Sequence, residues 1–102
     1  MRLFVMFDLP TLNKKDLQNY NKFRRLLLNQ SFYMVQLSVY AKLCAHHDEV
    51  IKTTSIISNH LPPKGNVRCL VVTEKQYESM KLLVDTQSYQ EEITNTNLII
   101  EL

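Results

Sequence analysis

The stretch RLFVMFDLP at residues 2–10 decides the fold class of this chain of 102 residues. Bulky apolar side chains occupy both alternating faces of the stretch as far as Phe7, and Pro10 follows it. A strand with two apolar faces is typical of a buried central position in a sheet. We therefore expect a sheet built around this strand, with the carboxylate of Asp8 emerging at its carboxyl end.

A helical pattern follows this strand. Asn13 is a suitable N-cap, with Asp16 three residues further on, and the helix is expected to end near residue 29 or 30. Its apolar positions recur every three or four residues and predict one buried stripe, formed by Leu17, Tyr20, Phe23 and Leu27.

Residues 31–44 alternate with a period of two, which predicts β-structure. Fourteen residues is long for one strand, so we expect a break near Gln36–Ser38. The side chains predicted to share one face are Tyr33, Val35, Leu37, Val39, Ala41 and Leu43.

The rest of the chain predicts one more helix and several strands. The helix spans residues 47–60, and its inner side is expected to carry Val50, Thr54, Ile57 and Leu61. A firm turn over residues 61–66, with the single glycine Gly65, leads to a strand over 67–73, a short turn or single helical turn at 74–78, and strands over 80–84 and 98–102. This order predicts one α+β domain over residues 1–102, ferredoxin-like βαββαβ with an extra C-terminal strand.

Two liabilities of such a fold predict a homodimer. Two helices cover only one face of the sheet, and the apolar final strand is a poor open edge. We therefore expect the uncovered face to pack on a second copy, with residues 80–102 reaching the partner subunit.

The composition excludes several classes of protein. An apolar fraction of 45% and a charged fraction of 22% are ordinary for one globular domain. There is no glycine-rich phosphate loop, zinc pattern, signal peptide or membrane-length apolar run.

Cys44 and Cys69 have apolar neighbours and are expected to be buried and reduced, which predicts a cytoplasmic protein. Residues 46–49 (HHDE) are adjacent rather than helically spaced, so we expect a polar helix start and no metal site.

The charge is unevenly distributed along the chain. Residues 1–45 hold seven Lys and Arg against two acids, whereas residues 46–102 hold five against eight. On the first helix Lys15, Gln18, Lys22 and Arg25 share one face, and Lys14 and Arg24 flank it. Such a row either neutralises nucleic-acid phosphates without reading bases or only solubilises the helix.

Asp8 is the sharpest candidate for chemistry. It either caps the turn into Pro10 or binds Mg²⁺, which accepts one protein carboxylate together with substrate phosphates. A twofold-symmetric dimer would bring two copies of Asp8 together. Ser38 has no histidine that the sequence places beside it to activate it as a nucleophile.

Five motifs are similar to those of one known family: FDLP (7–10), KFRRLL (22–27), VQLSVYAKL (35–43), LPPKGNVR (61–68) and VTEKQY (72–77). Across nearly the whole chain the sequence resembles CRISPR-associated protein 2, a small adaptation protein, and in particular the branch found in type II systems. The family usually has a glycine where this chain has Ser31, so we expect a strained or reshaped turn there.

The resemblance implies a function in antiviral defence. Family members are ferredoxin-like homodimers that bridge the CRISPR integrase, CRISPR-associated protein 1, on a protospacer DNA duplex during spacer acquisition. The family is also classed as a metal-dependent endonuclease, which implies Asp8 as catalytic residue and Mg²⁺ ligand. The family's basic residues on the first helix correspond to Arg24 and Arg25 in this chain. Its Ser-Val-aromatic segment corresponds to Ser38, Val39 and Tyr40.

Two hypotheses follow. In the first, the protein is a DNA-binding scaffold whose interface is formed by Lys14, Lys15, Lys22, Arg24 and Arg25. In the second, it is a metal-dependent endoribonuclease resembling virulence-associated toxin ribonucleases, with Asp8 holding Mg²⁺.

Overall fold

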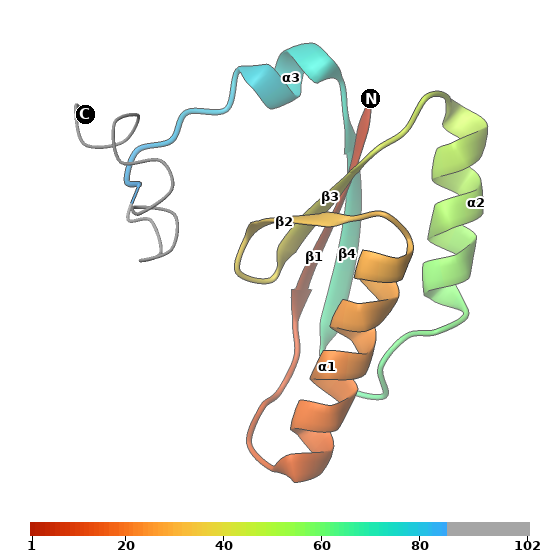
Figure 1. Cartoon of the computed structure of the whole chain (residues 1–102), viewed down its shortest axis with the longest axis vertical. Coiled ribbons are helices and arrows are strands. Elements are labelled where there is room, and N and C mark those ends of the chain that lie inside the picture. The colour runs from red at the N-terminus through yellow and green to blue at the C-terminus, as the bar shows by residue number, and fades with distance from the viewer. Residues whose placement is uncertain (86–102) are drawn as a thin grey trace.

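The computed structural model describes residues 1–85, which form a four-stranded antiparallel sheet with helices (Figure 1). The elements are β1 (Arg2–Asp8), α1 (Lys14–Asn29), β2 (Tyr33–Gln36), β3 (Val39–Leu43), α2 (His47–Ser58), β4 (Asn66–Val72) and α3 (Glu74–Glu78). The strand order is β2-β3-β1-β4, so the central position of β1 and the βαββαβ order are confirmed. None of the helices in residues 1–85 is long and apolar enough to cross a membrane.

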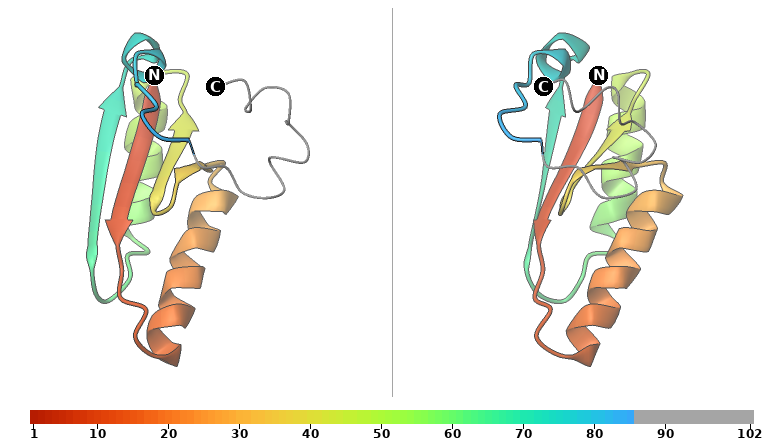
Figure 2. Two further views of the ribbon diagram at one scale, coloured as in Figure 1. Left: turned by 90° about the vertical axis from the view of Figure 1, so that its left-hand side faces the viewer. Right: turned by 60° about the vertical axis from the view of Figure 1, so that its left-hand side comes forward.

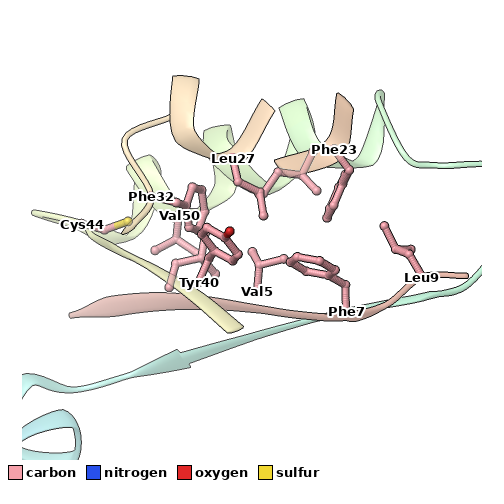
Figure 3. Packing of buried hydrophobic residues seen from close by; sticks show 11 residues of the cluster. Val5, Phe7, Leu9, Phe23, Leu27, Phe32, Tyr40, Cys44 and Val50 are labelled. Carbon is pink, nitrogen blue, oxygen red and sulfur yellow. The ribbon is translucent and has the colours of Figure 1, made fainter. Parts of the chain in front are cut away.

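The hydrophobic core lies between the sheet and the two long helices, which cover the same side of the sheet (Figure 2). Phe7 contacts aromatic residues of both layers: its ring stacks on Tyr40 at 5.7 Å and meets Phe23 edge-on at 5.2 Å. Figure 3 shows these rings between the helices and the strands, together with Leu27 and Val50. Burying one such side chain contributes roughly 1.5–3 kcal/mol, so this layer holds α1 and α2 on the sheet.

The predicted N-cap of α1 is confirmed, but its predicted stripe is wrong at the first position. The backbone N–H of Asp16 donates to the Asn13 side chain at 2.9 Å. Leu17 is 47% exposed, whereas Asp16 is buried. The reason is a tertiary contact: the first turn of α1 packs beside residues 62–64, and this contact buries position 16.

The predicted break in residues 31–44 is confirmed, because a turn at residues 37–38 separates β2 from β3. Most of the predicted shared face is confirmed. Tyr33 pairs with Ala41, and Val35 and Val39 line one hollow of the sheet. Leu37 is the exception because it lies in the turn, and Tyr40, on the other face, is buried in the core.

Two serines adopt the left-handed backbone conformation that favours glycine. Ser38 has φ 64° and Ser31 has φ 70°. The strained turn expected at Ser31 is therefore confirmed, and a residue with a Cβ costs about 1–2 kcal/mol in this conformation.

Three further expectations after β3 are wrong. Thr53, not Thr54, is buried in α2, where its hydroxyl accepts a hydrogen bond from the Lys42 ammonium at 3.0 Å. Leu61 is exposed because α2 ends at Ser58 and residue 61 lies in the following turn. Residues 80–84 leave α3 without joining the sheet, and the strand expected over residues 98–102 lies outside the described residues.

The two cysteines differ in their surroundings. Cys44 is buried as predicted, and burial raises the pKa of its thiol. Cys69 is exposed, so that part of the prediction is wrong: β4 is an edge strand and the helices do not cover its whole length. Both are free thiols.

The short helix α3 folds over one end of the sheet and is fixed to β1 by an ion pair. The Arg2 guanidinium donates hydrogen bonds to both oxygens of the Glu74 carboxylate, the shortest at 2.9 and 3.0 Å, and stacks 4.3 Å from the centre of the Tyr77 ring. The hydrogen bonds from Arg2 hold the pKa of Glu74 below its usual value. Tyr77 also contacts Phe4, so α3 covers one end of the sheet side that faces away from α1 and α2.

Candidate nucleic-acid interface

Asp8 ends β1 and points to the side of the sheet that α1 and α2 leave uncovered, which we call the open face. Residues alternate in orientation along a strand. Phe7 faces the core, so the side chain of Asp8 faces the other way and is exposed. The open face therefore presents a carboxylate at the end of the central strand, as the sequence predicts.

Two polar residues of β4 lie beside Asp8, and sequence reasoning missed both. The antiparallel register places Asn66 opposite Asp8 and Arg68 opposite Met6, so all four residues share the open face. Together with Phe7 they line a shallow hollow of about 200 Å³. A partial signal was present in the sequence, because Arg68 lies in the strand predicted over 67–73 and Asn66 directly precedes that strand, in alternation with Val67 and Cys69.

The backbone at Asp8 rests against Gly65, which explains why the single glycine occupies this turn. Gly65 has φ 98°, and a Cβ built on it would lie 2.5 Å from the Asp8 carbonyl oxygen. The ammonium of Lys64 lies 4.0 Å from the buried carboxylate of Asp16, which connects the same turn to α1. The turn over residues 61–65 thus packs against the end of β1 and holds it in position.

One subunit supplies only part of a metal site. Among residues 1–85 no three His, Cys, Asp or Glu side chains gather where they could hold an ion. Asp8 offers one carboxylate and Asn66 one amide oxygen on the same face. Magnesium would fit only with further oxygens, from substrate phosphates or from a second copy of Asp8.

The residues at 46–49 form a helix start, as predicted. His46 is the N-cap of α2, and the Glu49 carboxylate accepts a hydrogen bond from the backbone N–H of Ala45 at 2.9 Å. This hydrogen bond stabilises the start of α2, because it gives the backbone N–H of Ala45 a partner.

The five predicted nucleic-acid residues of α1 are all exposed: Lys14, Lys15, Lys22, Arg24 and Arg25. Within residues 1–85 none of them forms an ion pair. Because α1 lies on the covered side of the sheet, the row along this helix and the Asp8 carboxylate belong to opposite sides of the molecule (Figure 2).

Ser38 and Tyr40, which the family resemblance indicates as supporting residues of the site, both contact Phe7. The Ser38 carbonyl oxygen accepts a hydrogen bond from the Phe7 N–H at 3.0 Å, and the Tyr40 ring stacks on the Phe7 ring. Tyr40 is only 1% exposed. Both residues therefore fix the strand that carries Asp8, and Tyr40 offers no surface to a ligand.

The open face also carries an apolar hollow of about 430 Å³. It is bordered by β1, β4, the β2–β3 hairpin and α3, and its lining residues include Phe4, Met6, Val39, Leu70 and Tyr77. Leu70 is 53% exposed there. An apolar sheet face of this kind commonly marks a binding surface.

The fold and the site together define a class of small ferredoxin-like α+β proteins with a carboxylate at the end of the first strand and a cationic first helix. The family model for CRISPR associated protein Cas2 matches residues 1–80, and the chain belongs to this family.

Named relatives agree with this assignment. The "CRISPR-associated endoribonuclease Cas2" of Acidovorax ebreus (strain TPSY) is 45% identical over 95 residues, covering 93% of each chain. The protein of the same name from Lacticaseibacillus rhamnosus is 44% identical over 87 residues, covering 85% of this chain and 86% of that one. Streptococcus pyogenes Cas2, solved as a crystal structure at pH 6.5, superposes with a TM-score of 0.64 at 14% identity, over 82% of this chain and 100% of that one, and supports the fold.

Proposed function

We propose that this protein is a homodimeric DNA-binding scaffold of CRISPR adaptation, which bridges the integrase CRISPR-associated protein 1 on a protospacer duplex. The observation that carries the proposal is the row of exposed cations along α1, which form no ion pair within residues 1–85. Cations in such a row contact phosphates and are indifferent to base sequence. A scaffold that accepts foreign DNA of any sequence requires this kind of contact.

The homodimer is the second part of the proposal. The apolar hollow of the open face would be covered by the same face of a second copy, which makes the interface self-complementary. Residues 80–102 would then pack on the partner subunit. Such an interface would bring the two Asp8 carboxylates toward one axis.

A metal-dependent nuclease is the second candidate function, and the names of the relatives favour it. Magnesium bound between Asp8, Asn66 and a substrate phosphate would polarise that phosphate and acidify an attacking water. One carboxylate per subunit is a sparse site for this chemistry. We therefore propose the scaffold as the principal function, and we expect nuclease activity only from the dimer.

We further infer a cytoplasmic location. Both cysteines are free, and Cys69 is exposed to solvent. An exposed free thiol persists most readily in a reducing compartment.

The scaffold function predicts the result of a charge reversal on α1. Replacing Arg24 and Arg25 by glutamate removes two phosphate contacts, so the slope of log affinity against log salt should fall by roughly 1.8 for duplex DNA. Fluorescence anisotropy with a labelled duplex across a salt titration measures this slope. The same variant should bind duplex more weakly at every salt concentration.

A matched reversal provides the control. Lys52→Glu with Lys75→Glu makes the same change in net charge on exposed residues outside α1 and outside the segment proposed to reach the partner. It should weaken binding only through the overall charge and leave the slope nearly intact. Equal slopes for the α1 variant and the wild type would refute the proposed interface.

A further inference from the structure

Arg68 is the cation on the open face that lies nearest to Asp8 in the strand register. It faces Met6 across the β1–β4 ladder, one same-face position away from the Asp8–Asn66 pair. Such diagonal neighbours are about 7–8 Å apart, which is within the combined reach of an arginine and an aspartate side chain. Both side chains line the same hollow of about 200 Å³.

The two charges are not joined to each other or to other groups of the described chain. Within residues 1–85 neither Asp8 nor Arg68 forms an ion pair or a side-chain hydrogen bond. The polar groups that face the hollow are the carboxylate, the amide of Asn66 and the guanidinium. Such an exposed hollow suits an anionic ligand that binds together with a cation. The guanidinium would contact the anion, and the carboxylate would contact the cation.

We propose that Arg68 binds a phosphodiester of nucleic acid at the Asp8 end of the open face, with Asn66 as its polar neighbour. The planar guanidinium matches two phosphate oxygens at once. Asp8 repels the same phosphate unless a divalent cation lies between them, so Asp8 makes the contact dependent on that cation. The inference rests on the nucleic-acid function proposed above and adds a second phosphate site, on the side of the sheet opposite to α1.

This arrangement predicts coupling between the two residues. In EDTA, Asp8→Asn should tighten the binding of single-stranded RNA, because it removes a negative charge beside the bound phosphate. Arg68→Gln should weaken binding and lower the salt slope by roughly 0.7, the value for one phosphate contact on a single strand. Since the residues share one ligand, the effect of Asp8→Asn should shrink at least about threefold in the Arg68→Gln background.

The experiment is a double-mutant cycle on the full-length protein with a fluorescent single-stranded RNA, in EDTA and in magnesium. Arg68→Lys is the matched variant: it keeps the charge, so the salt slope should persist while affinity falls through the lost two-point contact. Light scattering checks that all variants keep the wild-type mass.

Additive effects of the two substitutions, or an unchanged slope for Arg68→Gln, would overturn the assignment of Arg68. The reversal of Arg24 and Arg25 runs in the same assay. If that reversal weakens RNA binding while Arg68→Gln does not, only the second phosphate site is refuted. If the wild type binds neither RNA nor duplex, both this inference and the proposed function are refuted.

Discussion

Replacing Gly65 with valine should destabilise the domain by about 3–5 kcal/mol, because backbone strain and steric collision combine. The residue has φ 98°, which a β-branched side chain does not tolerate, and its Cβ would collide with the Asp8 carbonyl oxygen and the Leu9 side chain. For a domain of this size the loss lowers the thermal midpoint by about 15 °C or more. Differential scanning calorimetry measures that midpoint directly.

Gly65→Asn separates the two causes. Asparagine tolerates positive φ but still carries a Cβ, so the remaining destabilisation of about 1–3 kcal/mol reports the collision with the end of β1 alone. An asparagine variant as stable as the wild type would show that the close approach to Asp8 is unimportant. A valine variant with an unchanged thermal midpoint would contradict the described turn altogether.

Leu70→Asp should convert the proposed dimer into a monomer. Leu70 lies in the apolar hollow of the open face, and an aspartate there would place an unpaired carboxylate in the interface. Loss of a central apolar contact costs about 2–4 kcal/mol. The dissociation constant should therefore rise by roughly 30- to 1,000-fold.

Light scattering at micromolar concentration distinguishes the two states by mass. The wild type should weigh about twice the 12.0 kDa of one chain, and the Leu70 variant should weigh one chain. Ile51→Asp is the matched control, since Ile51 is similarly exposed (59% against 53%) but lies on α2, away from the open face. That control should remain dimeric. A monomeric wild type would be incompatible with the proposed interface.

Much of the fold could be predicted from the sequence because its signals are local and redundant. The two-faced apolar run of β1, the Asn13 cap and the change of period at residue 31 each follow from side chains near one another in the chain. The errors arose where tertiary contacts reset a local pattern. Leu17 lost its place in the core to Asp16 because a distant turn packs there, and Thr53 is buried in place of Thr54 where α2 meets Lys42.

The candidate site was predictable only in part for the same reason. The exposure of Asp8 follows from its place at the end of an apolar strand. Its neighbours Asn66 and Arg68 depend on the β1–β4 register, which pairs residues about sixty positions apart and which no local pattern specifies. Which side of the sheet each charged group occupies likewise emerged only from the packing of α1 and α2.

We propose that the cations of α1, and not the Asp8 carboxylate, carry the biological function of this protein. Integration of a protospacer duplex, reconstituted with the integrase, tests this claim most directly when the wild type is compared with Asp8→Asn and with the reversal of Arg24 and Arg25. We predict that Asp8→Asn integrates close to the wild-type level and that the reversal loses most integration. Loss of integration in Asp8→Asn, with full activity in the reversal, would contradict the account.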